Sequence, residues 1–551
     1  MKTNRFIRIF MMALDTVVLF FLGLFRKFSK VYRYEATEQN NLEQQPHAVK
    51  GTSPEVLGIQ PELELDGEAV SNYERPDKID FPLTSPYTKM QGVVTFRGDN
   101  FRSGATYGTL TGAPKKLREG WAVTTGRLEK GYGKGYWTGS GWTGQPLIVR
   151  WDDQLKAVMN LYPHKKEKKG LVEAIYSTMD GNVYFIDIED GEKTRDDLHV
   201  GLPFKGAGAL DPRGIPLLYL GPGDSCGDEP ARGFIYSLID CKKLYEFGAQ
   251  DPFSLRKFHG YDSSVLVSES TDTLIAPGEN GIIYTMKLNT KFDIKTGELS
   301  IDPSQIVKLR YRTSRSSEQS YWLGMEDSGV IWKNYLYIAD NGGTMMCIDL
   351  NTMKIIWAQD VVDDTNGSPV FSVEDGGPYL YIATSLHWTA SRRLKLGDVP
   401  VFKINAITGE YVWKHTYLCN TVAGISGGVQ ATCINGKQNI SDLVIFPVAR
   451  TPQVRTGILA ALDKKTGETV WEFNTGKYVW SSPVDLYDGN GNAYIITCNS
   501  VGDMMLLDGR SGKLIDRINL GANIEASPAV FGDTLVVGTR GQKIYGIKIE
   551  S

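Results

Sequence analysis

The feature that most constrains the fold of this chain is a short frame that recurs along the sequence. Its clearest copy runs from Asp463 through Thr466-Gly467 to Trp471. In every copy the first and last positions lie eight residues apart, and the other copies are Asp349 to Trp357, Asn405 through Thr408-Gly409 to Trp413, Asp508 to Asp516, and Asp187 to Arg195. A unit that recurs every ~40–60 residues predicts a solenoid or a propeller.

Each frame follows two apolar segments that predict one four-stranded blade. A small-residue strand such as Gly367–Phe371 comes first, and a buried strand such as Tyr379–Ala383 follows it. The third strand then ends at the Asp, and the Thr-Gly pair makes a tight turn in which glycine supplies a positive φ. Trp begins the outer strand, where we expect its indole to pack against the neighbouring blade.

The innermost strands predict the number of blades. They begin near eight positions, which are Gln145, Lys205, Tyr261, Met325, Ser368, Ile425, Ser481 and Ala526. The last blade has only three strands, so we expect Leu117–Val123 to supply its outer strand and close the ring, which removes open sheet edges. The predicted fold is an all-β, eight-bladed β-propeller over residues 91–551, with a helical insert at Asp153–Tyr162.

Two segments precede the propeller. Residues 1–33 contain the apolar run Ile9–Phe25 between basic flanks, which predicts one transmembrane helix that stays uncleaved, with an amphipathic helix lying in the membrane plane as the alternative. Basic residues at both ends leave the charge bias undecided, and we expect the propeller on the extracytoplasmic side of the cell membrane. Residues 34–90 are polar and acidic and predict a flexible linker.

Charge and side-chain chemistry exclude several classes of function. The net charge is −4, which gives no overall attraction to nucleic acid. The six cysteines and six histidines are scattered without metal-ligand spacing, so no metal site is expected. We find no sequence motif that would assign a catalytic residue.

The Asp…Thr-Gly…Trp frame, together with Phe96–Gly104, resembles the PQQ-binding-like β-propeller repeat family. That family shares the eight-bladed fold of the quinoprotein alcohol dehydrogenases and of the outer-membrane assembly lipoprotein BamB. The resemblance implies a packing role for Asp349, Trp357, Thr408, Gly409, Trp413, Asp463, Thr466, Gly467 and Trp471. Family members that bind the quinone carry an adjacent Cys-Cys pair and a calcium ion. This sequence has no Cys-Cys pair, so neither PQQ nor calcium is expected.

A candidate binding face follows from the predicted topology. In a propeller, the loops between strands D and A and those between strands B and C open on the same face. These loops carry aromatic and arginine residues suited to recognition, namely Trp137, Trp142, Trp322, Trp388, Arg392, Arg393, Arg450, Arg455 and Trp480. In the alternative interpretation, the tryptophans fill the channel mouth and the arginines pair with nearby acids.

These features predict a membrane-anchored, extracytoplasmic propeller that acts as a non-catalytic binding or scaffold module. Its expected partner is a protein or a cell-envelope polymer, and no nucleic acid. The alternatives are a PQQ- and calcium-dependent oxidoreductase and a polysaccharide-binding module.

Overall fold

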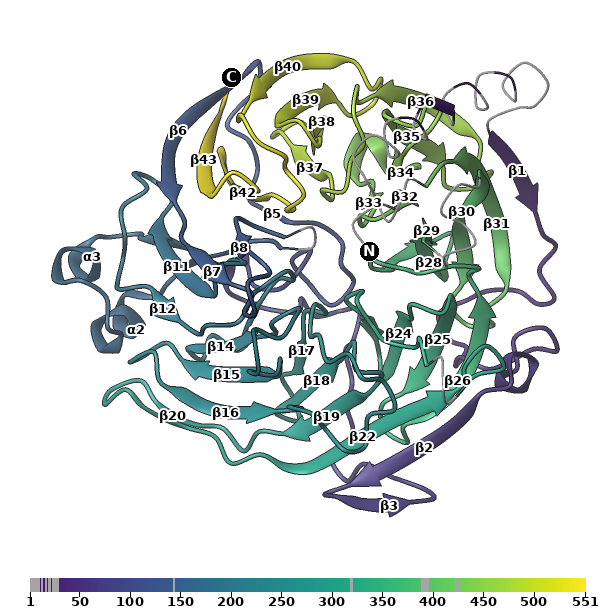
Figure 1. The fold of residues 1–551 in the computed structure, drawn as a ribbon, viewed down its shortest axis with the longest axis horizontal. Coiled ribbons are helices and arrows are strands. Elements are labelled where there is room, and N and C mark those ends of the chain that lie inside the picture. Colours follow the sequence, from purple (N-terminus) through teal and green to yellow (C-terminus); the bar gives the residue numbers. More distant parts are fainter. Residues whose placement is uncertain are drawn as a thin grey trace.

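The computed structural model describes residues 29–141, 144–317, 321–387, 396–421 and 426–551, together with residues 10, 13, 14, 17 and 21. Eight antiparallel sheets form a ring around a central axis (Figure 1). Each sheet contains four consecutive blade strands, A to D, and some sheets carry added strands at their edges. The predicted all-β, eight-bladed propeller is confirmed.

The first four blades occupy the first part of the ring. Their strands are β9 (Leu147–Arg150), β10 (Val172–Ser177), β11 (Asn182–Asp187) and β12 (Leu198–His199); β13 (Ala209–Leu210), β14 (Leu217–Leu220), β15 (Gly233–Ser237) and β16 (Lys243–Phe247); β17 (Leu266–Ser268), β18 (Thr273–Pro277), β19 (Ile283–Lys287) and β22 (Ser304–Arg312); β23 (Val330–Trp332), β24 (Tyr335–Ala339), β25 (Thr344–Asp349) and β26 (Lys354–Asp360).

The other four blades complete the ring. Their strands are β27 (Val370–Glu374), β28 (Gly377–Ala383), β30 (Gly397–Asn405) and β31 (Tyr411–Cys419); β33 (Ile434–Asn435), β34 (Leu443–Ala449), β35 (Gly457–Asp463) and β36 (Thr469–Asn474); β37 (Val484–Tyr487), β38 (Ala493–Cys498), β39 (Asp503–Asp508) and β40 (Leu514–Asn519); β41 (Ala529–Phe531), β42 (Thr534–Thr539), β43 (Lys543–Glu550) and β6 (Lys116–Thr124).

Shorter helices and strands lie in the connections between the blade strands. Helices α2 (Asp153–Val158) and α3 (Pro163–Glu167) lie between β9 and β10, and α2 confirms a shorter version of the predicted helical insert. The remaining elements are the hairpins β7 (Arg127–Glu129) with β8 (Tyr136–Thr138) and β20 (Lys291–Asp293) with β21 (Glu298–Ser300), the 3-10 helix η3 (Gln438–Ile440), and β29 (Ser385–Leu386) with β32 (Gly427–Gly428).

The ring is closed by a strand from before the first blade. Strand β6 pairs with β43, the last strand of the chain, in antiparallel register from Lys116↔Glu550 to Thr124↔Lys543. In Figure 1 the blue strand β6 lies beside the yellow β43. The predicted closing strand, Leu117–Val123, is therefore confirmed.

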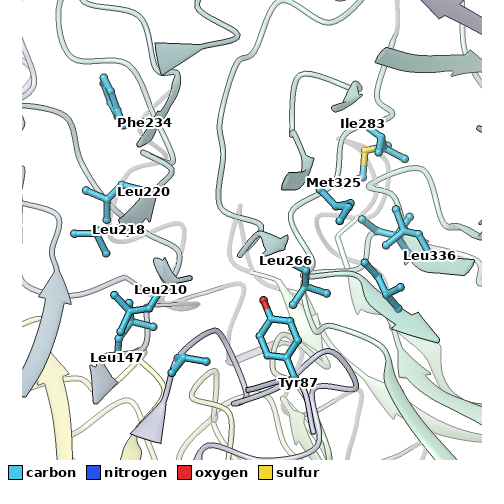
Figure 2. Close-up of a cluster of buried hydrophobic side chains, with 14 of the residues drawn as sticks. Tyr87, Leu147, Leu210, Leu218, Leu220, Phe234, Leu266, Ile283, Met325 and Leu336 are labelled. Atoms are coloured by element: carbon cyan, nitrogen blue, oxygen red, sulfur yellow. The ribbon is translucent and has the colours of Figure 1, made fainter. Parts of the chain in front are cut away.

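The core lies between the blades. Figure 2 shows side chains of blades 1 and 2 meeting at Leu147, Leu210 and Leu218, and those of blades 3 and 4 meeting at Leu266 and Met325. All five are buried. Because each strand B and strand C presents both faces to a neighbouring sheet, their sequences are continuously apolar rather than alternating.

A repeated contact joins the outer strand of each of several blades to the C–D turn of the next. The indole Nε1 of Trp413 donates to the carbonyl of Lys464 at 2.9 Å. The ring of Trp413 also lies over Gly467, where an added Cβ would come within 2.8 Å of it. Equivalent indole bonds run from Trp357 to the Ala406 carbonyl at 3.2 Å and from Trp121 to the Ile188 carbonyl at 2.9 Å.

Residues 34–90 do not form the flexible linker that the sequence predicts, because they lie along the rim of the propeller. Strand β2 (Gln60–Leu65) pairs with the outer strand β22, and β3 (Glu68–Val70) pairs with β2. Strand β1 (Ser29–Arg33) pairs with β31 in the same way, and η1 (Pro54–Leu57) lies between these strands in the sequence. Pairing at a sheet edge uses backbone groups, so a polar sequence can add a strand without a large apolar face.

A second unexpected segment fills the central channel. Residues 91–107, which begin with β4 (Gln91–Val93) and end with β5 (Thr106–Tyr107), bond to the innermost strand, or to the residue just before it, in every blade. The contacts to blades 1 and 8 are strand pairs, and those to blades 2 to 7 are the hydrogen bonds Leu210 N–Val94 O, Thr95 Oγ1–Val265 O, Ile331 N–Asn100 O, Phe371 N–Phe101 O, Arg97 Nη2–Cys433 O and Arg97 Nη1–Pro483 O. We call residues 91–107 the channel plug.

The predicted membrane anchor, Ile9–Phe25, lies mostly outside the described residues. Within the part of the chain that the structure describes, no helix combines the length and the apolar character needed to cross a bilayer.

Candidate functional site

The candidate site is a pocket of about 370 Å³ at the mouth of the channel. It opens on the face that carries the D–A and B–C loops, because all of its lining residues come from these connections or from the residues that lead into strand A of blade 6. They are Lys205, Arg256, Phe258, Glu279, Trp322, Glu326, Asp364, Asn366, His387, Ser426, Gln430 and Trp480. A larger hollow of about 780 Å³ lies on the rim beside β2 and β3, where the charged side chains Glu62 and Arg310 pair with each other.

Aromatic side chains form part of the pocket wall. Trp322 stacks on His387 with ring centroids 6.2 Å apart and 12° between the planes, and the guanidinium of Arg256 lies 4.4 Å from the Trp322 ring centroid. Trp480 contacts Tyr478, whose ring lies 4.7 Å from the guanidinium carbon of Arg450. The wall therefore offers flat apolar surfaces next to charged groups.

The two basic residues of the pocket are held by internal partners. Lys205 Nζ donates to the Gly223 carbonyl at 2.9 Å and lies 3.5 Å from Asp224. Burial alone would lower the pKa of Lys205, but surrounding carboxylates, Asp262 foremost, raise it overall. Arg256 bonds to the side chain of Glu279 at 3.1 Å and to its carbonyl at 3.0 Å.

Acidic residues outnumber these bases. Burial raises the pKa of Glu279 and of Asp364 well above the ordinary range, and in both the charge of Glu326 is the next largest cause. Directly beside the pocket, burial raises the pKa of Asp262 to about 7; Lys205 opposes this increase, whereas Glu326 adds to it. These carboxyl groups repel one another because they share a region of low dielectric.

His387 closes one side of this acidic cluster. Its Nδ1 lies 2.7 Å from the hydroxyl of Ser426 and 3.8 Å from the carboxylate of Asp364. Burial lowers its pKa, although the charge of Glu326 opposes the decrease. The ring is therefore neutral at pH 7 and does not cancel the charge of the carboxylates.

The structure brings together some of the residues predicted for the binding face. Trp322 and Trp480 both line the pocket. Trp137 on β8 lies near its edge, with Lys205 Nζ 5.5 Å from the ring centroid. Arg450 is buried and donates to the Val454 carbonyl at 2.8 Å, so its guanidinium is held inside its own loop, whereas Arg455 is exposed.

The remaining predicted face residues, Trp142, Trp388, Arg392 and Arg393, lie outside the described residues. Sequence reasoning missed the charged residues Lys205, Arg256, Glu279, Glu326 and Asp364, since they lie in irregular loops without the repeat. A signal was present, because Asp262, Asp327 and Asp364 each stand directly before a Ser or Thr that leads into strand A.

The described residues do not fit the quinone and calcium that the quinone-binding members of the resembled family carry. Within the described ranges, no three His, Cys, Asp or Glu side chains form a set that could hold a metal ion. Glu279 is already paired with Arg256, and Asp364 accepts a hydrogen bond from Asn341 at 3.0 Å. The cysteines stand at separate positions, and four of the six are buried.

Comparison with known proteins places the repeat and the fold. Residues 455–551 match the family described as outer membrane protein assembly factor BamB. The quinoprotein alcohol dehydrogenase PedH of Pseudomonas putida KT2440 is 33% identical over 119 residues, which are 21% of this chain and only 17% of that protein.

Two solved structures extend the comparison. Quinohemoprotein alcohol dehydrogenase ADHIIG from Pseudomonas putida HK5 aligns with a TM-score of 0.52 at 12% identity, covering 83% of this chain and 80% of that one. BamB from Moraxella catarrhalis aligns with a TM-score of 0.44 at 15% identity, covering 73% of this chain and 98% of that one. Residues 455–551 are therefore similar to the repeats of the BamB family, and the chain as a whole is an eight-bladed β-propeller whose fold is similar to that of a quinohemoprotein alcohol dehydrogenase.

Proposed function

We propose that this protein is a non-catalytic binding module that takes its ligand at the central pocket. The observation that carries the proposal is the convergence of Trp322, Trp480 and Phe258 with charged side chains on one concave site whose lining comes from six blades. Concave sites that combine aromatic walls with a few polar groups are typical of ligand recognition. The propeller supplies a rigid frame, and the loops supply the contacts.

The proposed partner is a protein or a cell-envelope polymer outside the cytoplasm. The basis is the apolar segment Ile9–Phe25, which we propose anchors the chain in the cell membrane. Protease added to intact cells, after removal of any outer layer, should cleave the propeller. Protection in intact cells together with cleavage in inverted vesicles would place the propeller in the cytoplasm and would contradict this part of the proposal.

The test of the binding site compares three forms of the full-length protein on fractionated cell envelope. We expect the wild type to be retained by one fraction, either membrane protein or polysaccharide. We expect Trp480→Ala to reduce that retention at least tenfold and Tyr34→Ala, an exposed aromatic on the rim, to leave it unchanged. Equal retention of all three forms would contradict a ligand at this pocket.

The same fractions separate the alternatives. Retention by purified glycan strands alone would support a polysaccharide-binding module, in which Trp322 and Trp480 stack on sugar rings. Titration with PQQ and calcium tests the oxidoreductase alternative. A bound chromophore with dye-linked oxidation of alcohols or sugars would overturn the non-catalytic proposal.

A further inference from the structure

We infer that the central pocket selects an organic cation, a guanidinium or primary ammonium group with a hydrogen-bond acceptor beside it. This inference rests on the proposed function, because it names the chemistry of the ligand that the same pocket would take. It follows from the charge balance of the lining, from one buried amide and from the aromatic wall.

Carboxyl groups outnumber basic groups in and directly behind the pocket. Glu279, Glu326 and Asp364 line it, with Asp262 directly behind, against two bases. Arg256 donates hydrogen bonds to the carboxylate of Glu279 and to the side-chain amide oxygen of Asn341. Lys205 donates hydrogen bonds to the carbonyl of Gly223 and to the carboxylate of Asp224. The hydrogen bonds of the two bases named here therefore go to groups other than Glu326 and Asp364.

Both of these carboxylates accept hydrogen bonds from neutral amide groups. Glu326 accepts a hydrogen bond from the amide of Asn366, and Asp364 accepts one from the amide of Asn341. His387, whose Nδ1 lies 3.8 Å from the carboxylate of Asp364, is neutral at pH 7 because burial lowers its pKa. A ligand cation at this place would relieve the repulsion within the carboxyl cluster, and its interaction would be strong because the site is poorly solvated.

Gln430 supplies an independent indication of a ligand. It lines the same pocket and is only 6% exposed, yet its Nε2 has no hydrogen-bond partner among the described residues. A buried donor without a partner costs ~1–3 kcal/mol, and a ligand that brings an acceptor removes this cost. The ligand thus needs an acceptor, such as a carbonyl oxygen, near its cationic group.

The wall of the pocket already shows how a guanidinium is accommodated. Arg256 lies over the ring of Trp322 at 4.4 Å and over that of Phe258 at 5.3 Å. An aromatic face attracts a cation most strongly when water is excluded. A ligand cation between the aromatic wall and the carboxylates Glu326 and Asp364 would be bound by the same chemistry.

The first test uses matched probes with the unmodified full-length protein. Isothermal titration calorimetry at pH 7.5 compares N-acetyl-arginine amide with N-acetyl-citrulline amide, a neutral compound of nearly the same shape. We expect saturable binding of the arginine compound and at least tenfold weaker binding of the citrulline compound. Equal binding of the two, or no binding of either, overturns the inference.

Additional probes test which groups of the ligand contribute to binding. Butylguanidine carries the guanidinium without the amide carbonyl and without a second charge, so we expect weaker binding than for the blocked arginine, and Gln430→Leu should remove this difference. A comparison of N-acetyl-lysine amide with its Nε-acetylated form, which lacks the positive charge, tests whether the pocket binds a primary ammonium group. Equal binding of butylguanidine and the blocked arginine would overturn the part assigned to Gln430.

Protein variants then test whether Glu326 and Asp364 bind the cationic group of the ligand. We expect Glu326→Gln and Asp364→Asn each to weaken the binding of N-acetyl-arginine amide at least tenfold. The control variant Glu269→Gln, in the A–B turn of blade 3, should leave this binding unchanged. Unchanged binding in both pocket variants overturns the inference. If no cationic probe binds the wild type while Trp480→Ala still abolishes envelope retention, the inference fails and the proposed function stands.

Discussion

Arg195 shows how a charged residue can take the place of a packing tryptophan. It stands at the final position of the degenerate frame that begins at Asp187. Its Nη1 donates to the Leu238 carbonyl of the next blade at 2.8 Å, the same kind of bond that Trp413 makes to Lys464. Its Nη2 pairs with Glu173 at 2.8 Å, and both side chains are fully buried.

Because of this burial, Arg195→Ala should lower the free energy of unfolding by ~3–5 kcal/mol, since it leaves the Glu173 carboxylate buried without its cation. Urea denaturation measures the change. The double variant Arg195→Met/Glu173→Gln should recover a large part of the loss, because it removes both charges. A double variant less stable than Arg195→Ala would contradict this explanation.

Asp262 should make stability depend on pH. Its folded pKa is about 7 against 3.8 ordinarily, so the folded state binds this proton more tightly. Its contribution to stability is therefore complete below about pH 3.8 and is lost as the pH rises through about 7.

In Asp262→Asn the loss of free energy between pH 4 and pH 8 should be smaller than in the wild type by ~1–4 kcal/mol. The remaining slope comes from other carboxyl groups whose pKa burial raises, among them Glu279, Asp327, Asp340 and Asp364. Urea denaturation at several pH values measures the slope, with exposed Glu167→Gln as a control that should leave it unchanged. A steeper slope in Asp262→Asn would contradict the assignment.

At the scale of the element, the unit that repeats is a contact between blades rather than a single blade. A tryptophan in strand D of one blade covers the C–D turn of the next, and glycine leaves room for its ring. Blade 4 has Met353 at the glycine position with a φ of 55°, so the left-handed turn persists without glycine. The left-handed backbone conformation and the close approach of the tryptophan ring are therefore two separate constraints on the glycine position of the C–D turn.

Two glycine substitutions separate those constraints. Gly467 and Gly476 have nearly the same φ, 73° and 72°, but a Cβ on Gly467 would meet Trp413 whereas one on Gly476 would meet nothing within 4 Å. Both alanine variants incur the ~1–2 kcal/mol cost of a left-handed residue, and Gly467→Ala adds ~1–3 kcal/mol for the steric conflict. Thermal and urea denaturation measure the difference, and equal stabilities would contradict the role of the Trp413 contact.

At the scale of the whole molecule, the channel plug holds the ring together from inside. Its residues bond to the innermost strand, or the residue just before it, in all eight blades, while β6 closes the ring on the outside. Arg97 is fully buried and joins the carbonyls of Cys433 and Pro483, which belong to neighbouring blades. The ring is thus stabilised by one non-repeating segment as well as by its repeats.

Arg97→Leu should lower the free energy of unfolding by ~2–4 kcal/mol because it leaves buried carbonyl groups without donors. The loss should appear locally, as faster amide hydrogen exchange in blades 6 and 7 than in blade 3. Arg118→Leu, on the exposed side of β6, is the control and should change neither quantity. A uniform increase in exchange around the ring would contradict a local role for Arg97.

The sequence predicted the features that repeat at short range. The blade count, the closing strand Leu117–Val123 and the two tryptophans Trp322 and Trp480 on one face could be predicted because each depends on local periodicity and on a known topology. The rim strands β1 and β2 and the channel plug could not, since they pair with residues tens to hundreds of positions away. Their polar sequences carry no periodicity that reveals such a partner.

By itself, the sequence determined the type of blade, the number of blades and how the ring closes, because apolar strands separated by tight turns are encoded within a few tens of residues. Only the tertiary structure decided that Glu279, Glu326 and Asp364 share one pocket with Arg256 and Gln430. Charge balance and pKa are properties of groups brought together in space. Residues from separate blades acquire them only when the ring has closed.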